Sequence, residues 1–151
     1  MGLLRRIAKK IVQTISSSTP ESPPPVSREH RPTPPKDESQ NNLSNIECTA
    51  QELRERLEAG EEVIIIDVRE DQELRASGII PNAQHFPLRQ LPSRWEELKH
   101  ANEVVCYCAG GARSYNAAML LRERGIFNAT SMEGGFATWR AIGGSSEPWN
   151  G

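Results

Sequence analysis

The chain has 151 residues, a formal net charge of −2 at pH 7 and three cysteines. This length is enough for one ordinary domain with a hydrophobic core and some sequence to spare. The charge balance lacks the basic surplus of nucleic-acid-binding proteins, so no nucleic acid is expected as a partner. The few cysteines do not make a disulfide scaffold and fit a reducing compartment, so we expect a cytoplasmic location.

The first segment, residues 1–15 (MGLLRRIAKKIVQTI), predicts a basic amphipathic helix. Its apolar residues recur at helical spacing. The basic residues on the opposite side are Arg5, Arg6, Lys9 and Lys10. Such a helix can contact a membrane surface peripherally, dock on a partner, pack on the protein itself or act as an organelle transit peptide. The sequence leaves these alternatives open.

Residues 16–45 are rich in proline and serine and hold almost no aliphatic side chains. Such a segment cannot bury enough apolar surface to offset the entropy lost on ordering, so it predicts a disordered linker. The folded domain is then expected to span residues 46–151.

Helical and strand patterns follow one another within residues 46–151. Thr49 and Glu52 in TAQE predict a capping box at the start of a helix that Gly60 ends, and VIIID (63–67) predicts a buried strand. The later elements are a charged helical turn at EDQELRAS (70–77), an extended AQHFP (83–87), a helix at RWEELKHA (94–101), a buried strand at EVVCYC (103–108), a helix at SYNAAMLLRERG (114–125), a short strand at NATSM (128–132) and a helical turn in GGFATWRAIG (134–143).

This alternation of strands and helices favours an α/β fold, with a parallel sheet covered by helices on both faces. Right-handed crossovers would place the functional loops at the carboxyl ends of the strands. Cys108 ends the second buried strand, so we expect it at that edge of the sheet.

The loop after Cys108 suggests a reactive thiol. Small residues at positions 109–112 let the backbone curl around Cys108, and its N–H groups can form an anion-binding cradle. The helix that begins near Ser114 and the guanidinium of Arg113 add positive charge. These groups should lower the pKa of the Cys108 thiol below its usual value of about 8.5. The sequence therefore predicts an exposed, activated sulfur nucleophile that needs no histidine base.

We expect Cys106 to have a different role from Cys108. It lies two residues before Cys108 in a regular strand, so both side chains point the same way. A small, buried apolar residue is the preferred interpretation, with a C-x-C redox or metal pair as the alternative. Because His30, His85 and His100 are scattered along the chain, no metal site is expected.

Four short motifs carry a resemblance to a known family. CAGGARS (108–114) is similar to a C-x-x-G-x-R-S active loop, and DVRE (67–70), IPNAQHFPL (80–88) and EGGFATW (133–139) resemble three further signatures in the same order. With these motifs, residues 46–151 resemble the single-domain rhodaneses, which are sulfurtransferases that form a persulfide. The resemblance implies a rhodanese-like fold.

The resemblance also implies two-step sulfur transfer without a cofactor. Cys108 would take a sulfane sulfur from a small molecule such as thiosulfate or from a protein persulfide, and a thiophilic acceptor would remove it. Amides of the loop would stabilise both the thiolate and the persulfide. The residues expected to form the active loop and bind the donor are Ala109, Gly110, Gly111, Ala112, Arg113 and Ser114.

Individual roles follow from the same resemblance. Arg113 is expected to orient the loop and hold an anionic donor. Ser114 is expected to cap the following helix, with donation to the sulfur as the alternative. Asp67 and Arg69 are expected to form a structural ion pair. Trp139 is expected in the core or in a pocket wall.

The chain departs from the family pattern at three positions. Ala109 stands where many members carry a basic residue, so an anionic donor loses one contact. Ile79 replaces the histidine of a G-H-I-P motif, and Asn82 replaces the glycine after its proline. These two changes affect an edge loop and not the nucleophile.

Two other functions are compatible with these residues. A cysteine phosphatase or arsenate reductase would use a similar cradle, but phosphatases of this architecture have five residues between cysteine and arginine, and residues 109–112 are one residue short of that. A non-catalytic adaptor or sulfur-carrier module is the second alternative, since the basic segment and linker would tether the domain near a surface.

Overall fold

The structure is a computed structural model that describes residues 45–151. The helix predicted for residues 1–15 and nearly all of the linker predicted for residues 16–45 lie outside the described residues. Within residues 45–151, every helix is too short or too polar to cross a lipid bilayer.

A parallel sheet forms the centre of the domain, as the sequence predicts. Its strand order is β1-β5-β4-β2-β3, and each strand pairs in parallel with its neighbour. Ile66 of β2 lies opposite Cys106 of β4, which fixes the register at the centre of the sheet. The strands are β1 (Glu47–Cys48), β2 (Ile64–Asp67), β3 (Gln84–His85), β4 (Val104–Tyr107) and β5 (Ala129–Met132).

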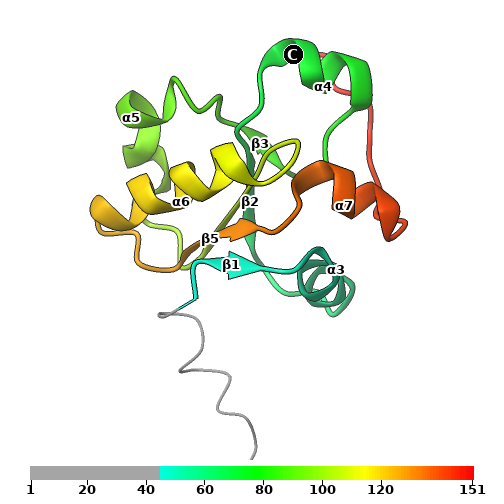
Figure 1. Ribbon diagram of the computed structural model, residues 1–151. Helices are drawn as coiled ribbons and strands as arrows, with labels where there is room; N and C mark the ends of the chain where they lie inside the picture. The colour runs from blue at the N-terminus through cyan, green and yellow to red at the C-terminus, as the bar shows by residue number, and fades with distance from the viewer. Residues whose placement is uncertain (1–44) are drawn as a thin grey trace, which may run out of the picture. The chain divides into compact units, whose positions relative to one another are not determined.

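Helices cover both faces of the sheet, which confirms the α/β fold class. Figure 1 shows α5 and α6 on one side of the sheet and α3 and α7 on the other. One buried cluster joins α5 and α6 to Ile66, Val104 and Cys106, and a second joins α3, α4 and α7 to Ile65 and Val105. The helices are α3 (Ala50–Glu58), α4 (Asp71–Ser77), α5 (Leu91–Arg94) with the following 3-10 helix η1 (Trp95–Leu98), α6 (Ala112–Glu123) and α7 (Gly135–Ala141).

The local signals at α3 work as predicted. The hydroxyl of Thr49 accepts a hydrogen bond from the amide of Glu52, and the Glu52 carboxylate accepts one from the amide of Thr49 at 2.8 Å. This capping box satisfies two N–H groups that a helix start leaves without partners. Gly60 follows the helix end with a φ of 79°, a conformation that glycine adopts at little cost.

Two predicted boundaries need correction. The single helix predicted for residues 94–101 is a short α5 that begins at Leu91 and passes into η1, which ends at Leu98. Pro92 lies in the first turn of α5, where its missing N–H costs nothing. The helix predicted from Ser114 begins two residues earlier, at Ala112, because Gly111 adopts the left-handed conformation and serves as its N-cap.

The two departures in the edge loop fit their surroundings. Asn82 has a φ of 65°, in the left-handed region that glycine favours and that asparagine tolerates better than most residues. Ile79 is buried, and its backbone exchanges two hydrogen bonds of 2.9 Å with Glu147. The loop therefore keeps a regular geometry with these substitutions.

Candidate active site

Cys108 follows β4 directly and lies at the carboxyl edge of the sheet, as predicted. Its side chain is only 1% exposed, so the prediction of an exposed nucleophile is wrong. The reason is its place in the buried cluster that joins the sheet to α5 and α6, while the first amides of α7 hold the backbone of the loop. The amide of Phe136 donates to the carbonyl of Cys108 at 2.7 Å, and that of Ala137 donates to the carbonyl of Ala109 at 3.1 Å.

The thiol nevertheless faces hydrogen-bond donors of its own loop. The amide of Gly111 donates to Sγ of Cys108 at 3.0 Å, and Oγ of Ser114 lies 3.5 Å from the same sulfur. Burial raises the pKa of Cys108, but the hydrogen bond with the Ser114 side chain and those from the amides of Ser114, Gly111 and Gly110 together lower it by more. The net pKa lies below the ordinary cysteine value, so the pocket favours a thiolate.

Ser114 does not cap α6, so the capping prediction is wrong. It lies inside the helix, its side chain is fully buried, and its hydroxyl donates to the carbonyl of Gly111 at 3.1 Å. The same oxygen lies 2.8 Å from Oγ of Ser131. The alternative from the sequence, donation from this hydroxyl to the sulfur, is not found either: the hydroxyl donates to Gly111, and in the 3.5 Å contact the Cys108 thiol is the donor to Oγ.

Glycines on both sides let α7 pack closely against the loop: Gly134 and Gly135 at the start of α7, and Gly111 in the loop. Gly135 has a φ of 59°, and a Cβ added there would press into the carbonyl oxygen of Cys108, well inside van der Waals contact. Gly111, with a φ of 108°, approaches the backbone of Gly134 less closely: a Cβ added there would lie 3.3 Å from the Gly134 nitrogen. The glycine pair in EGGFATW was the sequence signal for this contact, but its partner is not readable from the sequence.

Replacement of Gly135 with alanine should therefore disturb the loop. We expect the free energy of unfolding to fall by roughly 2–3 kcal/mol, because the new Cβ meets backbone atoms and the positive φ is strained. Gly110 is the matched control, since a Cβ added there meets no atom within 4 Å. Gly110→Ala should change stability by less than about 0.5 kcal/mol. Urea unfolding measures both, and equal losses in the two variants would contradict the packing described.

Arg113 forms an ion pair that the sequence did not reveal. Its two terminal nitrogens bind the carboxylate of Glu73 in α4 at 2.7 and 2.8 Å. The pKa of Glu73 is lowered to about 2, chiefly by the hydrogen bond from Arg113. The guanidinium that the sequence assigned to an anionic donor therefore has a carboxylate partner in this structure. The capping position of Glu73 is visible in the sequence, but a contact across 40 positions is not.

The ion pair expected between Asp67 and Arg69 is present and buried. The shortest nitrogen–oxygen distance is 2.7 Å, and the two side chains are 0% and 2% exposed. The Arg69 guanidinium also donates to Oγ of Ser77 and the carbonyl of Gly78, both at 2.8 Å. It lies 4.3 Å from the ring centre of Phe136, next to the loop. This pair thus joins the end of β2 to α4 and α7.

The other two cysteines differ from Cys108. Cys106 is a free thiol with no exposed surface, and burial raises its pKa. Cys48 is half-buried, and burial raises its pKa to about 11. Cys106 is thus the small buried core residue that the sequence favours, and Cys108 is the one cysteine in the chain whose surroundings lower its pKa.

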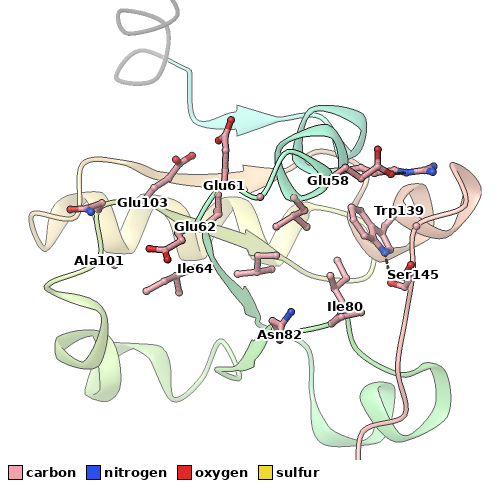
Figure 2. Close-up of a pocket in the computed structure, with 18 of the residues that line it drawn as sticks. Glu58, Glu61, Glu62, Ile64, Ile80, Asn82, Ala101, Glu103, Trp139 and Ser145 are labelled. Atoms are coloured by element: carbon pink, nitrogen blue, oxygen red, sulfur yellow. Dashed lines mark hydrogen bonds and ion pairs between the residues drawn. The ribbon is translucent and has the colours of Figure 1, made fainter.

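A cavity of about 720 Å³ lies elsewhere, at the amino ends of β2 and β4. Figure 2 shows it between Glu62 and Ile64 on one side and Ile80 and Trp139 on the other. Trp139 is 3% exposed and its indole donates to the carbonyl of Ser145 at 2.7 Å, so it is both core and cavity wall, as expected. The described cavity lining holds none of residues 108–114, so it is separate from the Cys108 site.

Comparisons with known proteins agree with the fold. A model of the Rhodanese-like domain matches residues 49–142. The chain is 39% identical over 104 residues to YtwF of Bacillus subtilis, whose name assigns it provisionally to the sulfurtransferases; the match covers 69% of this chain and 96% of that protein. It is 35% identical over 97 residues to a sulfurtransferase of Allochromatium vinosum, covering 64% and 90% of the two chains. The rhodanese-like domain of an Anabaena protein superposes with a TM-score of 0.62 at 31% identity, over 70% of this chain and 80% of that one.

Proposed function

The chain belongs to the rhodanese-like domain family, and on that premise we propose that it is a sulfurtransferase in which Cys108 carries the transferred sulfur. The observation that supports this role best is the 3.0 Å hydrogen bond from the Gly111 amide to Sγ. A donor fixed in the backbone stabilises negative charge on the sulfur before the substrate arrives, at no cost in reorganisation.

The proposed reaction has two displacements. The Cys108 thiolate attacks the outer sulfur of the donor, the donor's S–S bond breaks, and the leaving group departs with the electron pair; for thiosulfate it departs as sulfite. A thiophilic acceptor then attacks the terminal sulfur of the Cys108 persulfide, and the Cys108 thiolate leaves. Both steps begin or end with the same thiolate, so one set of loop donors serves both.

Detection of the persulfide tests this proposal directly. After treatment of the full chain with thiosulfate or an alkyl persulfide, peptide mass spectrometry should find an addition of about 32 Da, one sulfur atom, on Cys108. Cys48 and Cys106 are internal controls, because burial raises both of their pKa values and keeps them protonated. An adduct on either control and none on Cys108 would contradict the proposal, as would the lack of any adduct with both donors.

A further inference from the structure

The active loop carries a single cation. Among residues 108–114 only Arg113 is basic, and Ala109 occupies the position after the nucleophile. The Arg113 guanidinium is close enough to Cys108 for the thiolate to raise its pKa, although Glu73 contributes more. The charge that an incoming donor meets in this loop therefore depends on the state of Arg113.

Glu73 compensates that charge from a fixed position. Its carboxylate meets the Arg113 fork with two hydrogen bonds, at 2.7 and 2.8 Å, a geometry that only a planar carboxylate in register can provide. One of its oxygens also accepts the amide of Glu70 at 2.9 Å. Since Glu73 lies in the first turn of α4, this second bond anchors the carboxylate to its own helix.

The neighbouring arginine is compensated as well. Arg69 has its guanidinium against Asp67, with both side chains buried, so its charge is not offered to a ligand. Arg113 and Glu73 are 37% and 34% exposed, so their pair, unlike that of Arg69 and Asp67, is open to solvent. The charges of these two arginines are thus balanced by the two carboxylates, and the net charge beside the loop is close to zero.

We propose that Glu73 is a specificity-determining residue that directs the loop toward sulfur donors of low charge, such as alkyl persulfides, and away from dianions such as thiosulfate. This inference rests on the proposed function. The favoured step is Cys108–S⁻ + R–S–SH → Cys108–S–SH + R–S⁻. The Cys108 sulfur bonds to the terminal sulfur of the donor, the donor's S–S bond breaks, and the thiolate R–S⁻ leaves with the electron pair. No oxidant or reductant is needed.

The physical reason is desolvation. A dianion that enters the loop gives up water on all of its oxygens, and a compensated guanidinium returns little of that energy. An alkyl persulfide brings at most one negative charge, located on the sulfur that the loop amides already accommodate. Glu73 therefore penalises the dianion and has little effect on the persulfide.

The test compares donors in the full-length protein. The rate of Cys108 persulfide formation is measured with thiosulfate and with the persulfide of 2-mercaptoethanol. Glu73→Gln keeps the side-chain shape and removes the charge, so the thiosulfate-to-persulfide rate ratio should rise about tenfold, the effect of one hydrogen bond to a charged group. Glu70→Gln is the matched control, because Glu70 lies beside the same helix and pairs with Arg89 instead; its ratio should stay at the wild-type value. A role limited to positioning the loop would lower both rates and leave the ratio unchanged, which would overturn the proposal.

A second readout does not depend on sulfur transfer. Iodoacetate and iodoacetamide alkylate Cys108 by the same displacement of iodide but differ by one charge. The iodoacetate-to-iodoacetamide rate ratio at Cys108 should rise several-fold in Glu73→Gln, in line with one uncompensated charge near a surface. Ala109→Lys should raise the ratio without touching the Glu73 pair, which covers the case of a poorly folded Glu73 variant. If the wild-type protein takes sulfur from neither donor, the proposed function is wrong, but the alkylation ratio still tests the role of Glu73. An unchanged iodoacetate-to-iodoacetamide ratio in Glu73→Gln and Ala109→Lys would disprove that role.

Discussion

Replacement of Asp67 with asparagine is expected to lower the free energy of unfolding by about 3–5 kcal/mol. The Arg69 side chain is 2% exposed, and its guanidinium donates three hydrogen bonds to the Asp67 carboxylate. With asparagine there, the positive charge stays buried without a counter-charge, and its other contacts are neutral: the Ser77 hydroxyl, the Gly78 carbonyl and the Phe136 ring. The cost is that of an uncompensated charge in the interior rather than that of one lost contact.

Urea unfolding of the full chain measures this effect, and a surface ion pair provides the control. Arg54 and Glu58 form a pair of 2.8 Å in α3, with side chains 37% and 63% exposed. Glu58→Gln should therefore cost less than about 1 kcal/mol, as is usual for an exposed pair. If Asp67→Asn cost no more than this control, the Asp67–Arg69 pair would not have the role that its burial indicates.

The parts of this fold that sequence alone predicts are those set by neighbouring residues. The Thr49 capping box, the apolar strand at 63–67 and the strand that ends at Cys108 each depend on a few consecutive side chains, and all three are found as expected. The alternation of strands and helices predicts the parallel sheet, and the sheet predicts that Cys108 lies at its carboxyl edge. This chain of inference needs no knowledge of distant contacts.

Other features depend on pairs of residues far apart in the chain. β1 has only two residues and is a strand because Glu47 and Cys48 pair with β5, so its own sequence gives no signal. The burial of Cys108 comes from the cluster that joins the sheet to α5 and α6, whose members are far apart in the chain, and was therefore mispredicted from the loop alone. Likewise, Glu73, the partner of Arg113, lies on another helix. Because the sequence shows no partner for Arg113, its charge was predicted to bind the substrate.

Cys108→Ser should abolish sulfur transfer. A serine hydroxyl is not ionised near neutral pH, and oxygen in place of sulfur cannot carry a persulfide, so turnover of thiosulfate with cyanide should fall at least about 10³-fold, to the background rate. Cys48→Ser is the matched control and should keep wild-type activity, because Cys48 lies on β1, which β5 separates from the strand that leads to Cys108, and burial raises its pKa. Retained activity in Cys108→Ser would exclude the proposed mechanism. An aryl phosphatase activity that Cys108→Ser abolished would instead favour the oxyanion chemistry of a cysteine phosphatase.

The pH dependence of the wild-type rate separates an activated thiol from an ordinary one. The hydrogen bonds from Ser114 and the loop amides bring the pKa of Cys108 below the ordinary cysteine value despite burial. The reactive form is the thiolate, so the rate should rise with pH around this lowered pKa, with a midpoint below that of a free cysteine, about 8.5. Ser114→Ala removes the largest of these stabilising contacts and should move the midpoint of the profile to higher pH. A midpoint at or above about 8.5 in wild type would mean that the loop donors do not activate the sulfur. No movement in Ser114→Ala would mean that the Ser114 side chain has no part in that activation.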